Sequence, residues 1–405
     1  MSGTTRQLHC DVLVYVSSTQ RERRRAEVAR RKWRTTLQIA LLLFAVVGYV
    51  TISEGSGTRF QMLPALPTPA ASSKLILDAT TDGQRVLIGG EQGHILYSDD
   101  GGTTWTHAQV PVSLAITGVA FSDSHTAWAT AHDGVLLRSI DHGQIWETNL
   151  TGVDVARMAA DAAEQKVRQL QAEIEQADPD ALEDLEWALD DALFAVEDAS
   201  AVVEEGVTTP LLDVWFQNER NGYAMGAYGV LLHTSDGGTT WHLWSERLDN
   251  PDNYHLYGIA RSTSGTLLVA GEAGTLLRSR DNGDTWDRPV SPYPGSFFGV
   301  IAPQDGSLLA FGLRGNVFRS TDEGDSWSRV DTGDNRTLLA GTVMSDGNII
   351  LVGSAGAVLS SSDSGASFET ISTSGNRVYS GVTETTQGNL MLVGFGGVSF
   401  IDGMN

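Results

Sequence analysis

A short phrase that recurs at a nearly constant interval is the feature that most constrains the fold of this chain. Six complete copies run from a Ser or Thr through an Asp and a Gly to an aromatic residue, as in SDDGGTTW at 98–105. The aspartates of these boxes stand at Asp100, Asp141, Asp236, Asp281, Asp322 and Asp363, in steps of 41, 95, 45, 41 and 41 residues. A period of this length predicts one structural unit copied along the chain.

Two further columns follow the same period. A glycine precedes each box aspartate by seven residues, and another aligned column lies 15 or 16 residues earlier still. That column consists of Asp78, Gly118, Asp213, Gly258, Gly299, Gly341 and Gly381. It indicates seven repeats of four short strands each, and a unit of that kind is typical of a propeller blade, which cannot bury both faces alone. We therefore expect an all-β fold over residues 53–405, a seven-bladed β-propeller of four-stranded blades.

The seventh repeat ends without a box, so its outer strand must come from elsewhere. Residues 58–63 resemble the start of an outer strand, and Phe60 lies one repeat length, 45 residues, before Trp105. We expect this segment to close the ring and to cover the strand edge that would otherwise invite aggregation.

The boxes themselves are expected to be structural. An Asp carboxylate can accept backbone N–H groups across a turn, and the Gly supplies a backbone conformation with positive φ. The aromatic rings of Trp105, Trp146, Trp241, Trp286 and Trp327 are expected to pack between blades, where a large ring contributes most to burial.

This pattern resembles the Asp-box, or bacterial neuraminidase, repeat. Its extended form, G-x-x-G-x-(L/V/I)-(L/F)-x-(S/T)-x-D-x-G-x-(T/S)-W, most resembles the propellers of the photosystem II assembly and stability factor family. That resemblance implies a non-catalytic scaffold that assembles a membrane complex. Similar proteins of bacteria without photosynthesis are often encoded beside exporters of the resistance-nodulation-division type. Asp boxes also occur in glycan-cleaving enzymes, and the fold alone does not decide between these functions.

The N-terminal part predicts a membrane anchor. Residues 1–34 form a basic segment, and the apolar run at 35–52 is just long enough, at about 1.5 Å per residue, to cross a bilayer core of about 30 Å. The positive-inside rule keeps the basic segment in the cytoplasm, so the propeller is expected on the periplasmic side of the inner membrane. A cleaved signal peptide is the alternative. Residues 53–405 carry 18 Lys and Arg against 47 Asp and Glu, a charge that argues against a nucleic-acid partner.

The long step between the second and third boxes indicates an insertion. Residues 154–205 are rich in Ala, Leu and acidic residues, with apolar positions at three-four spacing on either side of Asp178-Pro179. This predicts an α-helical hairpin between blades two and three, on the face opposite the boxes. Either it is a solvated, self-contained hairpin, or it is a docking arm for a membrane protein. Its candidate partner-binding residues are Met158, Trp187 and Phe194.

No catalytic, cofactor or metal site is predicted. The arginine triad, Tyr-Glu pair and Phe-Arg-Ile-Pro phrase of sialidases have no convincing counterpart, and the histidines lack metal-ligand spacing. Asp78 and Asp213 replace Gly in the innermost column, so they are candidates to line the central channel. As a pair they could serve a glycosidase, but we expect them to bind water or neighbouring backbone.

Two functional hypotheses remain. The first is a membrane-anchored, non-catalytic accessory or assembly subunit of an inner-membrane complex, with an exporter of the resistance-nodulation-division type as the named candidate. The second is a periplasmic glycan-active or glycan-binding propeller, which paired carboxylates and stacked aromatic residues at a channel mouth would favour.

Overall fold

A computed structural model describes residues 63–205, 208–371 and 376–401. These residues form seven consecutive antiparallel sheets, numbered here 1 to 7 in chain order. The first strands are β1 (Ile76–Thr81), β5 (Ile116–Phe121), β9 (Leu211–Phe216), β13 (Leu256–Arg261), β16 (Phe297–Ile301), β20 (Leu338–Val343) and β24 (Tyr379–Glu384). The second strands are β2 (Val86–Gly90), β6 (Ala127–Ala131), β10 (Gly222–Gly226), β14 (Leu267–Gly271), β17 (Leu308–Gly312), β21 (Ile349–Gly353) and β25 (Leu390–Gly394).

The third strands are β3 (Ile95–Ser98), β7 (Leu136–Ser139), β11 (Leu231–Thr234), β15 (Leu276–Ser279), β18 (Val317–Ser320), β22 (Val358–Ser361) and β26 (Gly397–Ile401). The fourth strands are β4 (Thr106–His107), β8 (Glu147–Leu150), β12 (His242–Leu243), β19 (Ser328–Val330) and β23 (Glu369–Thr370). Sheet 4 has a single bridge, Arg278 to Asp287, in place of a fourth strand. Among the described residues, sheet 7 ends at β26.

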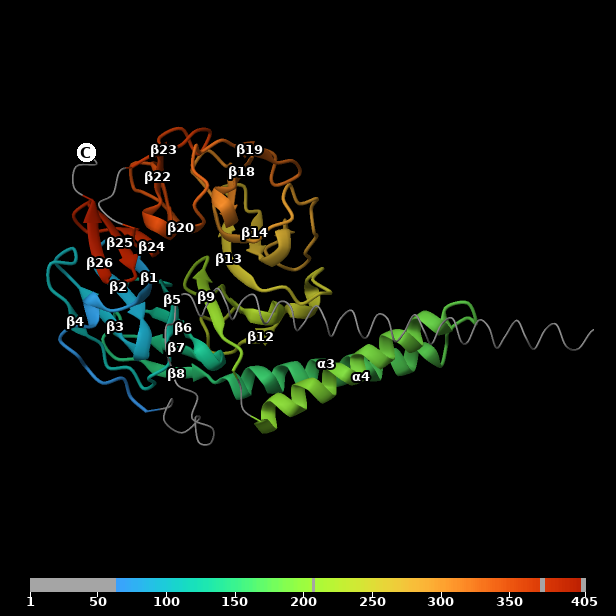
Figure 1. Ribbon diagram of the computed structural model, residues 1–405. Helices are drawn as coiled ribbons and strands as arrows, with labels where there is room; N and C mark the ends of the chain where they lie inside the picture. Colours follow the sequence, from blue (N-terminus) through green and yellow to red (C-terminus); the bar gives the residue numbers. More distant parts are fainter. Residues whose placement is uncertain (1–62, 206–207, 372–375, 402–405) are drawn as a thin grey trace, which may run out of the picture. The chain divides into compact units, whose positions relative to one another are not determined.

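The first strands lie at the centre of the arrangement. Each contacts the first strand of the next sheet, and β24 contacts β1, so the sheets close on one another (Figure 1). This confirms a mostly β, propeller-like fold. The second strand of every sheet is buried along its whole length, which explains why these segments read as continuous apolar runs.

The hydrophobic core is divided among the joints between sheets. Seven clusters of buried residues each combine side chains of two neighbouring sheets, including one cluster that joins sheet 7 to sheet 1. The aromatic residue of each box packs in the cluster between its own sheet and the preceding one. Trp146, for example, is 3% exposed and packs with Leu87 of sheet 1. Each sheet therefore depends on its neighbours for burial, as the repeat predicted.

The turns between the second and third strands form the other regular feature. They are short 3-10 turns, η2 (Glu91–Gly93), η3 (His132–Gly134), η4 (Ala227–Gly229), η6 (Glu272–Gly274), η7 (Leu313–Gly315) and η8 (Ser354–Gly356). Two others, η1 (Ala71–Ser73) and η5 (Ser245–Arg247), lie in connections. The face of the fold that carries the six turns between second and third strands is called the η face below. The boxes lie at the opposite ends of the third strands.

Two helices, α3 (Gly152–Ile174) and α4 (Leu182–Glu205), are inserted between β8 and β9 and pack against each other. α3 begins two residues before the predicted insertion because Thr151 caps it. The Thr151 side chain and the Asp154 carboxylate exchange hydrogen bonds with each other's backbone N–H groups. α4 begins at Leu182, because Asp178 to Ala181 form a turn closed by the Ala181 N–H and the Asp178 carbonyl.

The hairpin starts and ends beside one glycine of the η face. A Cβ atom placed on Gly134 would lie 2.7 Å from Gly152 Cα and 3.4 Å from the Thr209 carbonyl oxygen. Near this point Val155 is buried, and Met158 packs against the core between sheets 2 and 3. Met158 therefore helps to fix the hairpin to the propeller, and because it is only partly buried its role in partner binding stays a prediction.

Two N-terminal predictions lie largely or wholly outside the described residues. The apolar run 35–52 is one of them. Among the residues that the structure describes, no helix is both long and apolar enough to span a membrane. Of the predicted closing strand 58–63, only Leu63 is described. Just after it, the Ala65 N–H donates to the Val110 carbonyl at 3.0 Å, and Ala65 packs on the core between sheets 1 and 2. Closure by this strand stays a prediction.

Replacing a box aromatic residue should measure how much one joint between sheets contributes to the free energy of unfolding. We expect Trp146→Ala to lower the free energy of unfolding by about 3–5 kcal/mol, because it leaves a cavity between sheets 1 and 2. Trp146→Phe keeps most of the packing and loses the hydrogen bond from Nε1 to the Gly143 carbonyl, so it should cost about 1 kcal/mol. Urea unfolding followed by tryptophan fluorescence measures both. Equal losses for the two variants would contradict the assignment of the ring to the joint core.

Candidate functional site

Each box is a turn held from within by its aspartate. In sheet 1 the Ser98 hydroxyl donates to Asp100 Oδ1 and accepts the Gly102 N–H, both at 2.7 Å. The Asp100 carboxylate also accepts the Thr104 N–H at 2.8 Å and the Thr104 hydroxyl at 2.6 Å. Gly102 has φ +91°, which a residue with a side chain rarely adopts.

The other five boxes repeat this geometry around their own aspartates. Each aspartate accepts the hydroxyl of the first box residue and the N–H of the residue four positions later. The hydrogen bonds from the residue four positions after the aspartate are the main reason that the carboxyl pKa is lowered. The pKa falls to about 2 in Asp100, Asp236, Asp322 and Asp363. The stability that they contribute is present above about pH 4 and is lost as the pH falls toward 2. The box carboxylates are thus engaged in their own turns.

The boxes also join neighbouring sheets, a role that the sequence analysis missed. In every complete box, a backbone carbonyl accepts a hydrogen bond from a side chain of the preceding sheet. The donor and acceptor pairs are Gln387 to Asp100, Arg85 to His142, Asn149 to Gly238, Tyr223 to Asn282, Arg278 to Glu323 and Arg319 to Ser364, at 2.8–3.2 Å. The donors differ in type, so no sequence column reveals them. Sheet 7 lacks a box, and there Glu384 instead binds the Ser345 N–H and hydroxyl at 2.6 and 2.7 Å.

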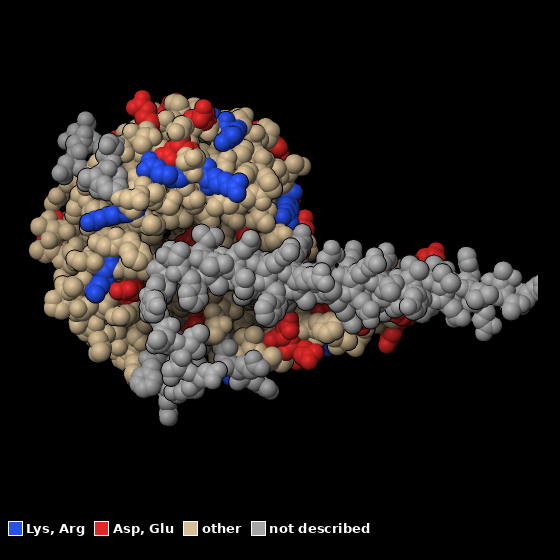
Figure 2. All heavy atoms as spheres, viewed as in Figure 1, with Lys and Arg blue, Asp and Glu red and all other residues tan. Residues whose placement is uncertain are grey.

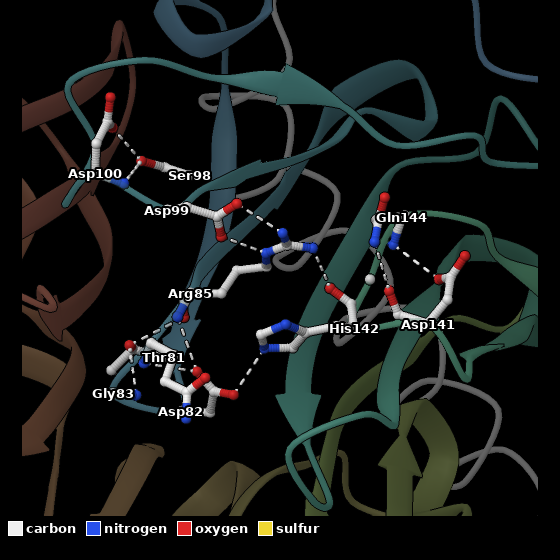
Figure 3. A network of polar contacts seen from close by, with 12 residues as sticks. Thr81, Asp82, Gly83, Arg85, Ser98, Asp99, Asp100, Asp141, His142 and Gln144 are labelled. Atoms are coloured by element: carbon white, nitrogen blue, oxygen red, sulfur yellow. Dashed lines mark hydrogen bonds and ion pairs between the residues drawn. The ribbon is translucent and has the colours of Figure 1, made fainter.

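The joint between sheets 1 and 2 shows how such a contact is built (Figure 3). The Arg85 guanidinium is held by both oxygens of Asp99, at 2.6 and 2.7 Å, and its Nη1 donates to the His142 carbonyl at 2.8 Å. The His142 ring reaches back to Asp82 of sheet 1, with Nε2 2.7 Å from Oδ2. Two polar contacts in opposite directions therefore cross this joint.

The joint between sheets 4 and 5 contains a more deeply buried arginine. Arg278 is 4% exposed and donates to both oxygens of Asp287 at 3.0 and 2.6 Å. Its Nη1 donates to Asp325 Oδ1 at 2.8 Å and to the Glu323 carbonyl at 2.9 Å. Arg138, at the same repeat position, instead stacks over Trp128 at 5.3 Å. These arginines are structural, and they do not converge on a substrate.

The two aspartates of the innermost column lie near each other and bind backbone. Asp78 Oδ2 accepts the Val119 N–H of sheet 2 at 2.8 Å, so it ties the first strands of sheets 1 and 2 together. Asp213 Oδ1 accepts the Val214 N–H at 2.8 Å. Asp213 Oδ2 lies 3.7 Å from the place that a Cβ atom would take on Gly258 of sheet 4. Each carboxyl group therefore uses one oxygen to bind backbone of the first strands, but both residues remain partly exposed, and their lining of a central channel stays a prediction.

This placement raises both pKa values. Burial raises the pKa of Asp78 to about 6, against the opposing effect of the Val119 and Ala79 N–H groups. Burial and then the nearby Asp78 carboxylate raise the pKa of Asp213 to about 8. A raised carboxyl pKa means that the folded protein holds the proton more tightly than the unfolded chain does. The stability contributed by the two protonated groups is present at low pH and is lost as the pH rises from about 4 to about 8.

The hairpin presents an acidic surface with two exposed apolar side chains. In Figure 2 acidic side chains lie along it, whereas Lys and Arg gather over the sector of β18 to β26. On α4, Phe194 is 51% exposed and its neighbour Leu193 is 47% exposed. Trp187, on the same helix, is half-buried.

Three arginines lie together on the η face of sheets 5 to 7. Arg314 belongs to η7, Arg336 Nη1 donates to the Ala355 carbonyl of η8, and the Arg377 carbonyl accepts the Gly356 N–H. Arg314 and Arg377 are exposed, while Arg336 is paired with Asp334. These residues are far apart in the chain, so the sequence alone does not reveal that they share one face.

The described residues offer no set for metal binding. Nowhere in these ranges do three His, Cys, Asp or Glu side chains come together in a way that could hold an ion. The acidic loop at 248–253 is organised by Asn250, whose side chain bonds to the Tyr254 carbonyl and N–H at 2.9 and 3.1 Å.

Comparisons with known proteins confirm the resemblance to the photosystem II assembly factor. The family model of the photosynthesis system II assembly factor YCF48 matches residues 194–337, and the BNR/Asp-box repeat model matches residues 96–107. The photosystem II assembly lipoprotein Ycf48 of Synechococcus sp. (strain CC9902) is 32% identical over 90 residues. That match spans 20% of this chain and about a quarter, 26%, of the relative.

Solved structures show the fold alone. YCF48 bound to D1 peptide has a TM-score of 0.55 at 15% identity, with 83% of this chain and 97% of that chain covered. YCF48 from Cyanidioschyzon merolae has a TM-score of 0.56 at 15% identity, with 82% and 96% covered. The WD40 β-propeller domain of Doa1 is equally similar, with a TM-score of 0.56 at 9% identity and 85% and 97% covered.

Arg278 and its neighbour Arg280 provide a matched test of the joints. We expect Arg278→Gln to lower the free energy of unfolding by about 2 kcal/mol, because a buried joint loses hydrogen bonds to charged groups. The Arg280 side chain is 50% exposed and contacts the same Asp325, so Arg280→Gln should change stability by less than about 0.5 kcal/mol. Urea unfolding at pH 7 distinguishes the two. Similar losses would show that the surface ion pair matters and the joint does not.

The innermost carboxyl pair predicts an unusual pH dependence. We expect Asp213→Asn to stabilise the protein at pH 9, because the variant removes a carboxylate that burial disfavours and keeps an oxygen for the Val214 N–H. At pH 5 wild-type Asp213 is protonated, so the two proteins should have nearly equal stability. Urea unfolding at both pH values is the measurement, with Asp249→Asn on the exposed loop as the control. A variant less stable than wild type at pH 9 would overturn the assignment.

Proposed function

We propose that this protein is a non-catalytic propeller that helps to assemble or support a membrane protein complex. The similarity to the YCF48 family model supports an assembly role, and one propeller of that name has been solved bound to a peptide. The carboxylates that are the candidates for catalysis bind backbone within the fold. Each box carboxylate binds its own turn, and the innermost pair binds backbone N–H groups.

The glycan-active alternative finds less support. It needs two carboxylates available to a sugar and aromatic rings to stack against it. Asp78 and Asp213 each already bind a backbone N–H, and the box rings are packed in the joints. The comparisons point to an assembly factor rather than to a hydrolase.

The finer organisation is part of the same proposal. The seven sheets would be the complete set of blades, with the seventh closed by residues 58–63. Residues 35–52 would anchor the chain in the inner membrane, with residues 1–34 in the cytoplasm and the propeller in the periplasm. An exporter of the resistance-nodulation-division type is the candidate complex. The apolar length of 35–52 and the basic residues before it support the anchor.

The α3–α4 hairpin would be the docking arm, and the main support for this role is the composition of its surface. An insertion of two long helices into a compact repeat costs ordering entropy and is unneeded for ring closure. Its root is fixed by Val155 and Met158, while Leu193 and Phe194 are about half exposed on α4. Residues 154–205 hold 16 acidic and three basic side chains. The partner would therefore present a basic segment around an apolar strip.

Affinity purification of tagged full-length protein from detergent-solubilised membranes tests both the arm and its partner. We expect a stoichiometric integral membrane protein with the wild type, and more than tenfold less of it with Leu193→Ser/Phe194→Ser. A single buried apolar contact of this size is worth about 1.5–3 kcal/mol. Ala195→Ser, at the next and also exposed position, is the matched control and should retain the partner.

A photo-crosslinking residue at position 193 identifies the segment that the arm contacts. Crosslinks to a basic, apolar-lined segment of the same membrane protein would support the docking arm. Retention of that protein by the double variant, or crosslinks to an acidic segment, would refute the arm. Absence of any membrane partner with the wild type would refute the assembly role itself.

A further inference from the structure

Residues Thr68 to Lys74 form a strap across the joint between sheets 7 and 1. Ala71 of η1 is 1% exposed and belongs to the core that these two sheets share. η1 contacts β26, and the Ser72 carbonyl oxygen lies only 2.1 Å from the place that a Cβ atom would take on Gly397. At the other end of the strap, the Thr68 carbonyl is 2.8 Å from His107 Nε2 of β4. The strap thus holds the last described strand of sheet 7 to sheet 1.

A buried histidine without polar partners lies beside this strap. His94, which follows η2, is 3% exposed, and neither of its ring nitrogens forms a hydrogen bond with any described residue. Its ring meets that of His107 edge to face, with centroids 5.7 Å apart. Buried polar groups are nearly always hydrogen-bonded, so an unpartnered imidazole at this position needs an explanation.

The charged groups around His94 disfavour its protonation. Burial is the largest cause that lowers the His94 pKa, and His107 on β4 and Lys74 at the end of the strap lower it further. Glu91, the carboxylate of the same turn, makes no ion pair with His94. A protonated His94 would be a buried cation near two basic residues. The free-energy cost of this buried charge could fall only if water entered the site or the strap moved.

We propose that His94 makes the Thr68–Lys74 strap an acid-sensitive latch, so that protonation of this buried ring loosens the strap from β4 and β26. Because the unfolded chain binds this proton more readily, the contribution of His94 to stability is present above about pH 6.5 and is lost as the pH falls below that value. The strap directly precedes the first strand, so its release would lengthen the segment between the propeller and the anchor proposed above for residues 35–52. This proposal does not depend on the docking arm.

Hydrogen exchange of the full-length protein at pH 7.5 and pH 5.0, corrected for intrinsic exchange rates, tests the latch. In the wild type we expect several-fold faster exchange at pH 5.0 in peptides covering 68–74 and 397–401. Peptides from β17, in the joint core of sheets 5 and 6, should be unchanged. His94→Phe keeps a ring that cannot be protonated, so it should abolish the acid response of the strap.

Two further variants keep the outcome decisive. His94→Gln should also abolish the response, and it replaces the Phe variant if that protein fails to fold. His125→Gln alters an exposed histidine of the β5–β6 turn and should leave the response intact. An acid response that persists in a folded His94 variant, or a wild-type strap whose exchange is the same at both pH values, would overturn the proposal. If the acid response were lost in His107→Gln but kept in His94→Phe, it would come from His107, and the proposal for His94 would be refuted.

Discussion

The hydrogen bonds that run from one sheet to the box of the next are the interaction on which the rest of the structure depends. No single sheet can bury both of its faces, so the fold exists only when neighbours are held in register. The box aspartate fixes a turn whose carbonyl groups point toward the preceding sheet, and a side chain of that sheet binds one of them. The box aromatic ring then fills the same joint. One short phrase therefore combines a turn, a polar link and an apolar contact, which explains why it recurs while the surrounding sequence varies.

Much of the fold was predictable because the repeat consists of a few residue types at fixed spacing. The strand order, the buried second strands and the inserted helices follow from periodicity and turn chemistry. The donors of the joints were not predictable, since Arg85, Tyr223 and Gln387 reach box carbonyls from different positions in their sheets. The packing of Met158 at the hairpin root was not predictable either, because an apolar residue at helical spacing gives the same sequence pattern there as on a docking surface.

Long-range placement also explains the other differences. The sequence shows Asp78 and Asp213 only as exceptions in a glycine column, and their mutual influence on pKa arises from the closure of the ring. Likewise, Arg314, Arg336 and Arg377 come to neighbouring turns of the η face only when sheets 5 to 7 are placed side by side. His94 could be read as an ordinary turn residue, because the sequence does not show that it packs against His107, the residue that binds the strap.

The two ends of the helical insertion meet at Gly134, and this has a consequence for the history and engineering of the molecule. Because the chain leaves the propeller and returns to it beside the same glycine, sheets 2 and 3 are joined as they would be by a short loop. The arm can then be lengthened, shortened or exchanged without altering the spacing of the sheets. Propellers of this architecture can accordingly acquire new attachments by insertion at a single loop, and the hairpin could be grafted onto a related ring as a self-contained part.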